Sequence, residues 1–215
     1  MSEEIVVVVS GGEAPDPRAT LAVPLGAPVV AADRGLEHAL ALGLAVTLAV
    51  GDFDSASPEA VAVAEASGTR IERHPAAKDA TDLELALDAA AAMSPSRILV
   101  LASGGGRLDH QLATLLLLGA ERYADAQVDA SIGGSRVHVI RGARSLEGLS
   151  GELISLLALH GPAEAVTTEG LAYPLRGETL EAGSSRGVSN VFEGDVASVS
   201  VARGVLLAIV PGGIE

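Results

Sequence analysis

The sequence predicts an N-terminal α/β domain with a mostly parallel, doubly wound sheet, followed by an all-β C-terminal sandwich domain. In the first part of the chain, up to Tyr123, short β-rich runs alternate with helical patterns, which is the rhythm of a parallel sheet. After Tyr123 no strong helical period follows, and the segments are strand-like. The 215 residues suffice for two small domains, which we expect to span residues 1–140 and 141–215.

Several strands expected in the N-terminal domain are almost wholly apolar, as strands covered on both faces are. The expected strands are residues 5–9, 29–32, 46–50, 70–73 and 98–102. The helices expected between them are residues 36–42, 58–66, 82–93 and about 108–123. Ser57 before Pro58 predicts one helix start, and the capping box formed by Thr81 and Glu84 predicts another.

The C-terminal part shows strand patterns separated by turn residues. The expected strands are residues 128–132, 137–141, 152–159, 165–168, 196–201 and 205–210. Hairpin turns are expected at residues 133–134 and 203–204, where glycines occur. This pattern predicts a small sandwich or barrel.

Composition narrows the possible partners. The chain has 28 acidic and 14 basic side chains, a net charge of −14, and no basic block, so we expect neither nucleic acid nor an anionic membrane as partner. The absence of cysteine excludes disulfides, thiolate catalysis and cysteine-bound zinc. A Walker A loop needs a glycine directly before its lysine and a serine or threonine directly after it. The single lysine, Lys78, has neither, since Asp79 follows it, and this excludes a Walker A loop. A phosphorylated substrate would therefore have to arrive with a cation.

The apolar fraction of 48% predicts a folded core. No apolar stretch reaches about 18 residues, the length that a membrane-spanning helix needs. The first residues also lack the basic start of a signal peptide. We therefore expect a cytoplasmic protein with no membrane segment.

Unusual polar residues follow four of the expected strands. Because ligands of open α/β sheets bind beyond the carboxyl ends of the strands, we expect these loops to surround one crevice. The loops contain Asp33, the Gly-Asp-Phe-Asp-Ser segment at 51–55, the Lys-Asp-Ala-Thr-Asp segment at 78–82, and the Gly-Gly-Gly-Arg-Leu-Asp-His segment at 104–110.

The acidic residues of these loops are candidates for binding a hard cation. Asp52 and Asp54 flank one residue, so in an extended loop both carboxylates could point the same way. Aspartate, glycine and serine are also ordinary turn formers, which is the alternative for this loop alone. Asp79 and Asp82 lie at an expected helix N-terminus, where the helix dipole keeps carboxylates ionised.

The glycine-rich segment at 104–110 could receive phosphate. Glycines let backbone N–H groups approach an anion, and Arg107 could hold a phosphate by a forked contact. Asp109 stands where a dinucleotide-binding fingerprint has its last glycine, and a tight turn with a paired Asp109 and His110 is the alternative. The long polar loop at 183–192 could equally be a plain surface loop.

Taken together, the motifs resemble those of the thiamine pyrophosphokinases. The similarity runs from about residue 29 to residue 210 in family order, and five ordered motifs make it highly specific. The five motifs are A-A-D (31–33), G-D-F-D-S (51–55), K-D-x-T-D-L-E-x-A-L (78–87), G-G-R-L-D-H-x-L-A (105–113) and S-R-G-V-S-N-x-F (185–192), and the similarity also includes T-T-E-G-L-x-Y-P-L (167–175).

The resemblance implies that the chain transfers the pyrophosphoryl group of ATP to the thiamine hydroxyl, giving thiamine diphosphate and AMP. It implies an N-terminal ATP- and Mg²⁺-binding domain, a C-terminal thiamine-binding sandwich, and a homodimer with active sites between subunits. The implied catalytic residues are Asp33, Asp52, Asp54 and Asp82, of which Asp52, Asp54 and Asp82 hold Mg²⁺. The implied ATP and phosphate contacts are Asp79, Gly105, Gly106, Arg107, Asp109 and His110, and the implied thiamine contacts are Arg186, Ser189 and Asn190.

The chain departs from the family pattern at three points that concern substrate contact. Arg34 replaces a usual glycine, Thr114 replaces a frequent asparagine, and there is no tryptophan to stack on a thiamine ring. Two alternatives stay open: a pyrophosphokinase of the same fold acting on another primary alcohol, such as a hydroxymethylpterin, and a thiamine- or nucleotide-binding homologue without turnover.

Overall fold

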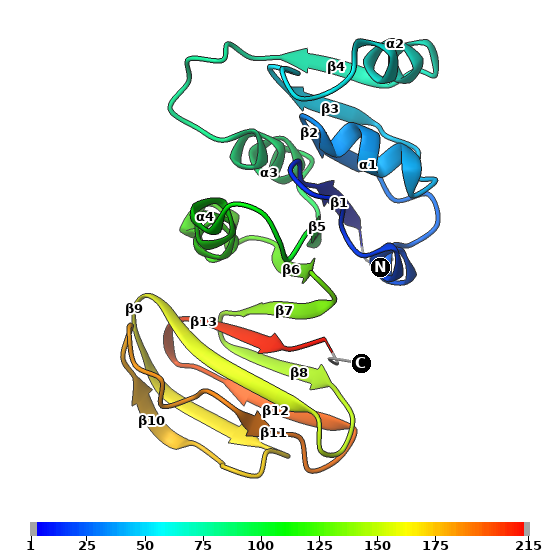
Figure 1. Ribbon diagram of the computed structural model, residues 1–215. Helices are drawn as coiled ribbons and strands as arrows, with labels where there is room; N and C mark the ends of the chain where they lie inside the picture. Colours follow the sequence, from blue (N-terminus) through cyan, green and yellow to red (C-terminus); the bar gives the residue numbers. More distant parts are fainter. Residues whose placement is uncertain (1–3, 213–215) are drawn as a thin grey trace. The chain divides into compact units, whose positions relative to one another are not determined.

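The computed structural model describes residues 4–212, and the chain divides into two compact units (Figure 1). The first unit comprises the residues up to 117 together with 125–134, and the second comprises 118–124 and the residues from 135 onward. The expected boundary at residue 140 and the ligand of each domain stay predictions.

The first unit contains a parallel sheet. Its strands pair in the order β4-β3-β2-β1-β5-β6, and each neighbouring pair is parallel. This order confirms the expected parallel sheet, with crossovers that reverse direction at β1. The strands are β1 (Ile5–Val9), β2 (Val29–Ala32), β3 (Leu48–Gly51), β4 (Arg70–Arg73), β5 (Arg97–Ala102) and β6 (Gln127–Ile132).

Helices lie on both faces of this sheet (Figure 1). The buried residues of α1 and α2 form one apolar cluster with alternate residues of the strands, including Val7 and Val9. On the opposite face, α3 packs against β1, β2 and β3. The helices of this unit are α1 (Gly35–Ala41), α2 (Pro58–Ala66), α3 (Asp82–Ala92) and α4 (Leu108–Leu118), with a 3-10 turn, η1 (Pro17–Ala22).

Both expected helix starts form as the sequence indicates. The Ser57 hydroxyl accepts a hydrogen bond from the Ala60 backbone N–H at 3.2 Å, and Pro58 follows it. The Thr81 hydroxyl accepts one from the Glu84 N–H at 3.2 Å. These caps fix where α2 and α3 begin, and thereby fix the position of the acidic loop before each helix.

Close packing at Gly35 holds α1 against the end of β1. A Cβ atom built on Gly35 would lie 2.2 Å from the backbone oxygen of Val9, a distance that no side chain tolerates. The glycine therefore lets the helix begin directly beside the strand, two residues after Asp33. This contact positions the loop that carries Asp33.

Two expected elements of the first unit have different bounds. Strand β3 begins at Leu48, two residues later than expected. The helix expected over 108–123 ends at Leu118, and Glu121–Tyr123 form a separate 3-10 turn, η2, which belongs to the second unit. Gly119 is a weak helix former, and Ala120 adopts an extended conformation that interrupts the helix.

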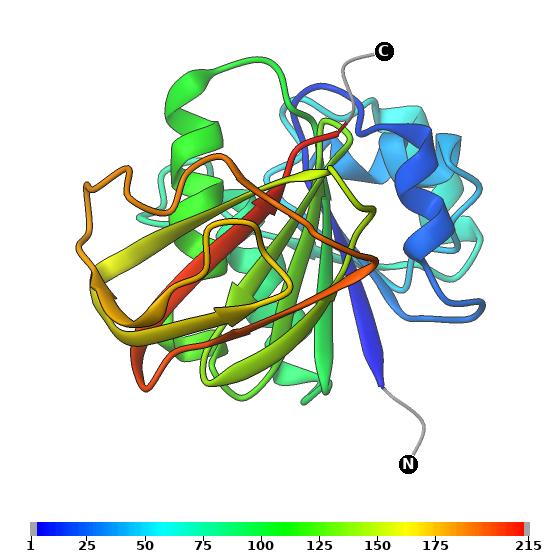
Figure 2. The ribbon, with the colours of Figure 1, turned by 90° about the horizontal axis from the view of Figure 1, so that it is seen from below.

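The second unit is built from antiparallel strands around one apolar core. Figures 1 and 2 show β9 as a long yellow strand, and it pairs with β10, β11, β12 and β13. The path of paired strands is β7-β13-β9-β12-β8. The strands are β7 (Ser135–Ile140), β8 (Ala143–Glu147), β9 (Leu153–Glu169), β10 (Arg176–Leu180), β11 (Asn190–Val191), β12 (Val196–Ser200) and β13 (Arg203–Val210). This confirms a β-rich C-terminal part.

The expected strands 152–159 and 165–168 are one continuous strand, β9. His160 and Ala165 have left-handed φ angles of 59° and 54°, and the pairing of β9 shifts register in this region, so the chain bulges without leaving the sheet. The turn expected at residues 203–204 is also displaced, because both residues belong to β13. Across residues 4–212, no helix is long and apolar enough to cross a membrane.

Candidate functional site

Asp33 follows β2 and is held in a left-handed conformation with φ of 47°. Its backbone N–H donates to the Val50 oxygen at 2.8 Å, which ties it to the end of β3. The residue is only 7% exposed. One carboxylate oxygen, Oδ2, accepts a hydrogen bond from the Ser55 hydroxyl, whereas the other, Oδ1, is buried without a hydrogen-bond partner. A buried carboxylate oxygen with no partner is costly unless a ligand satisfies it.

Asp52 lies in the loop after β3, and its neighbour Phe53 anchors that loop. Phe53 is buried, with the guanidinium of Arg73 placed 5.1 Å from the centre of its ring. Its φ of 57° turns the chain, so the loop is not extended as we expected. The Asp54 backbone N–H then donates to Asp52 Oδ1 at 3.3 Å. Side chains alternate from side to side only along an extended chain. Asp52 and Asp54 therefore lack the extended backbone that would point both carboxylates the same way.

Asp82 is the first residue of α3, directly after the cap Thr81. Its carboxylate approaches the end of β3 closely, since a Cβ built on Gly51 would lie 3.1 Å from Asp82 Oδ1 and from Asp33 Cα. Gly51 thus leaves room for both acids. Asp82 Oδ1 lies 3.1 Å from Lys78 Nζ as an ion pair, but this oxygen lacks an aligned hydrogen bond.

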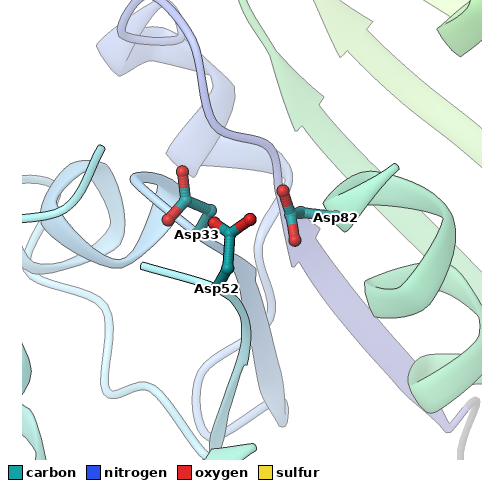
Figure 3. A group of neighbouring side chains, drawn as sticks. All are labelled: Asp33, Asp52 and Asp82. Carbon is teal, nitrogen blue, oxygen red and sulfur yellow. The ribbon is translucent and has the colours of Figure 1, made fainter. Parts of the chain in front are cut away.

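The carboxylates of Asp33, Asp52 and Asp82 converge and form what we name the acid cluster (Figure 3). Each offers one oxygen, and these oxygens lie within 4.8 Å of one another. Figure 3 shows the three carboxylates near one another, coming from the loop after β2, the loop after β3 and the start of α3. Among the described residues, Asp54 and Asp79 lie outside this group, and Asp79 is exposed. Oxygen ligands so arranged suit a hard divalent cation.

Lys78 shapes the electrostatics of the acid cluster. Its ammonium donates a hydrogen bond to Asp52 Oδ2 at 3.1 Å, and this contact lowers the pKa of the Asp52 carboxyl. Burial lowers the pKa of Lys78, but its contacts with Asp52 and Asp82 outweigh burial and leave that pKa raised. The negative charge of Asp52, followed by partial desolvation, raises the pKa of Asp54. The cluster therefore holds a strong surplus of negative charge.

The glycine-rich turn precedes α4 and packs tightly. Gly104 lies against Gly133, where a Cβ on either would come within 2.8 Å of the other's Cα. Gly106 has φ of 85°, which favours glycine. A Cβ on Gly105 would lie 2.2 Å from a carboxylate oxygen of Glu13, so an acidic side chain lies over this turn.

Arg107 and Asp109 form an exposed, forked ion pair after this turn. The Arg107 Nε and Nη2 atoms donate to the two carboxylate oxygens of Asp109 at 3.1 and 2.6 Å. The pair raises the pKa of Arg107 and lowers that of Asp109. The His110 backbone N–H, rather than its ring, donates to Asp109 at 3.0 Å. The guanidinium is therefore oriented at the surface by a carboxylate with the same forked geometry that a phosphate offers.

In the second unit, Asn190 is buried, and its side-chain amide bonds to the backbone. Its Oδ1 accepts from the N–H groups of Tyr173 and Val191 at 3.0 and 2.9 Å, and its Nδ2 donates to the Tyr173 oxygen at 2.8 Å. Asn190 thus holds the 185–190 loop against the 167–175 segment. Ser189 is exposed, with φ of 60°, and Arg186 pairs with Glu178 at 2.9 Å.

Comparison with models of known protein families shows to which family the chain belongs. The catalytic-domain model of thiamin pyrophosphokinase matches residues 27–128, and its vitamin B1 binding-domain model matches residues 137–206. This chain belongs to the thiamine pyrophosphokinase family. The acid cluster, the glycine-rich turn and Arg107 all lie inside the match to the catalytic domain, and the 185–192 loop lies inside the match to the binding domain.

Relatives of known name agree with this family over nearly the whole chain. A thiamine pyrophosphokinase of Bacillus subtilis is 28% identical over 182 residues, which cover 84% of this chain and 85% of that protein. The crystal structure of thiamin pyrophosphokinase from Geobacillus thermodenitrificans has a TM-score of 0.81, with 26% identity and coverage of 98% and 99%. That of a thiamin pyrophosphokinase family protein from Enterococcus faecalis has a TM-score of 0.80, with 27% identity and the same coverage.

Some contacts around the site have no clear signal in the sequence. Ser55 binds Asp33, a partner 22 residues away, and Glu13 reaches the glycine-rich turn from the loop after β1. Lys78 stands out as the only lysine, but its position between Asp52 and Asp82 depends on the fold.

Proposed function

We propose that this chain transfers the pyrophosphoryl group of ATP to the hydroxyl of thiamine, giving thiamine diphosphate and AMP. The observation that carries the proposal is the convergence of Asp33, Asp52 and Asp82 inside the region that matches the catalytic domain of the family. The match of residues 137–206 to the vitamin B1 binding domain favours thiamine over a hydroxymethylpterin as the acceptor.

The acid cluster fits Mg²⁺ as the cofactor. Two observations support this fit: the cluster offers only carboxylate oxygens, and Asp33 Oδ1 is buried with no hydrogen-bond partner. Asp33, Asp52 and Asp82 would hold the ion, and Asp54 stays a ligand predicted from the sequence alone. When bound, Mg²⁺ would neutralise charge on the phosphate oxygens of ATP.

The reaction joins the thiamine oxygen to the β-phosphorus of ATP and breaks the bond from that phosphorus to the α-phosphate oxygen, so AMP leaves. Gly105 and Gly106 would place backbone N–H groups toward the phosphates. Arg107 would exchange Asp109 for a phosphate and stabilise the equatorial oxygens. Asp109, His110 and Asp79 would contact the nucleotide. Most of the rate would come from positioning the two substrates.

One acid must accept the proton of the thiamine hydroxyl. Asp33 and Asp82 are the candidates: Asp33 Oδ1 is buried without a hydrogen-bond partner, and Asp82 Oδ1 is contacted only by Lys78, as an ion pair without an aligned hydrogen bond. Asp33 is additionally oriented by Ser55. The carboxylate that receives this proton would hold it only until products leave.

Thiamine would bind to the second domain. Ser189 and Arg186 are exposed in the loop that the sequence assigns to thiamine, whereas Asn190 would act mainly by holding this loop in place. We assign residues 1–140 to ATP and Mg²⁺ and residues 141–215 to thiamine. A cytoplasmic homodimer with its active sites at the subunit interface is the assembly that we propose.

Incubation with ATP, Mg²⁺ and thiamine should yield AMP and thiamine diphosphate in equal amounts. Transfer of an intact pyrophosphoryl group produces AMP, whereas two successive phosphoryl transfers produce ADP. Chromatography of the nucleotides and thiamine esters separates these outcomes. The same incubation with a hydroxymethylpterin should leave ATP unchanged. Product from the pterin alone, or no AMP at saturating substrates, would overturn the proposed function.

A further inference from the structure

We propose that Lys78 is a built-in counter-ion of the acid cluster, which it must leave before a divalent cation can bind. The Lys78 ammonium lies 3.1 Å from Asp52 Oδ2 and 3.1 Å from Asp82 Oδ1. Its side chain is 14% exposed, so the ammonium is largely shielded from water where it meets these two acids. The inference rests on the proposed function, because it assumes that the cluster is the cation site.

The ion-free cluster needs a positive charge. Three carboxylates with oxygens within 4.8 Å of one another repel strongly, and Asp33 and Asp52 are largely shielded from water. Lys78 is the only lysine of the chain, and it bridges two of the three acids. A compact ammonium on a flexible stem suits this place better than the forked guanidinium of arginine.

Lys78 neutralises the negative charge of the acid cluster only in part. One positive charge faces three carboxylates, and Asp33 Oδ1 remains without a hydrogen-bond partner. A divalent cation would carry twice the charge and could contact all three acids. The cluster should therefore prefer the divalent ion, while Lys78 remains the weaker competitor.

The ammonium and the cation cannot share the same oxygens. Lys78 contacts one oxygen each of Asp52 and Asp82, and an ion held by the same carboxylates would place a second positive centre close to the ammonium, where the two repel each other. Lys78 lies in the connection between β4 and α3, which has no helix or strand of its own. It can therefore move away without breaking an element of the fold, so cation binding includes the cost of separating Lys78 from both acids.

The test is the affinity of the nucleotide-free protein for Mn²⁺ alone, measured from the electron paramagnetic resonance signal of the free ion. Lys78→Met keeps most of the length of the side chain and removes its charge, and should tighten Mn²⁺ binding by about tenfold or more, equivalent to about 1.4 kcal/mol. Lys78→Arg keeps the positive charge and should tighten Mn²⁺ binding less than Lys78→Met does. Arg70→Met removes an exposed positive charge that pairs with Glu72, and should change the affinity by less than about twofold.

Thermal melting gives a second readout without turnover. In the presence of a chelator, Lys78→Met should melt below wild type, because its acids lack a counter-ion. Excess Mg²⁺ should then raise the melting temperature of the variant more than that of wild type. Lys78→Gln serves the same comparison if the methionine variant does not fold without the ion.

Failure of the inference and failure of the proposed site have different signatures. If Lys78→Met and Lys78→Gln bind Mn²⁺ no more tightly than wild type, Lys78 is not a competitor and the inference is wrong. Asp52→Asn serves as the reference, because it removes one acid of the cluster. If Asp52→Asn binds Mn²⁺ as tightly as wild type, the cluster is not the cation site, and the proposed function loses its cofactor site as well.

Discussion

Asp52→Asn should lower the rate of thiamine diphosphate formation by about a thousandfold at saturating ATP, Mg²⁺ and thiamine, equivalent to about 4 kcal/mol of transition-state stabilisation. The substitution keeps the shape of the side chain and removes its charge from the acid cluster. The remaining acids, Asp33 and Asp82, would then have to hold the cation with one negative charge fewer. The measurement is kcat from the initial rate of AMP release.

Glu65→Gln is the matched control for this variant. Glu65 is exposed on α2, outside the acid cluster, and its neutralisation should leave kcat within about twofold of wild type. Thermal melting of both variants separates loss of catalysis from loss of fold. If folded Asp52→Asn retained more than a tenth of wild-type activity, the charge of Asp52 in the acid cluster would not be needed for catalysis, and the proposed mechanism would be wrong.

Phe192→Ala should destabilise the second unit by about 3–5 kcal/mol, the range for truncating a fully buried phenylalanine. Phe192 is 1% exposed and belongs to the core cluster of this unit. Its ring fits against Gly148, since a Cβ there would lie 2.7 Å from the ring. Urea unfolding monitored by circular dichroism measures the loss.

Tyr173→Ala is the control in the same unit. The Tyr173 side chain is 62% exposed, and the contacts that fix this residue are backbone bonds to Asn190. Its truncation should change the free energy of unfolding by less than about 0.5 kcal/mol. Similar small losses for both variants would show that Phe192 does not organise the core.

The parallel sheet could be predicted because its pattern is local and repeated. Apolar runs such as 5–9 and 29–32 are too short for helices and are separated by helical patterns with recognisable caps at Ser57 and Thr81.

The antiparallel unit was harder to predict. His160 and Gly161 look like a break between two strands, but they form an irregular stretch inside β9 that only the pairing with its neighbours sustains. The sequence of β10, Arg176–Leu180, has no continuous apolar run, and we predicted no strand there.

The convergence of acidic loops could be predicted because strands of a parallel sheet end at the same edge. Which of these carboxylates come together could not be predicted, because this depends on backbone angles that the residue types do not reveal. Phe53 adopts φ of 57°, and Asp33 adopts φ of 47°. In the chain with these angles, Asp33 rather than Asp54 forms the group with Asp52 and Asp82. The assignment of Asp54 as a metal ligand therefore stays a prediction from the sequence.

The acid cluster as cation site is tested most directly by the position of the cation in a crystal grown with Mn²⁺ and a non-hydrolysable ATP analogue, located by anomalous diffraction. Cation binding by the acid cluster predicts a peak within about 2.5 Å of carboxylate oxygens from Asp33, Asp52 and Asp82. It also predicts that Lys78 has moved away from Asp52 and Asp82. A peak bound elsewhere, with Lys78 still between these acids and the acid cluster free of manganese, would contradict it.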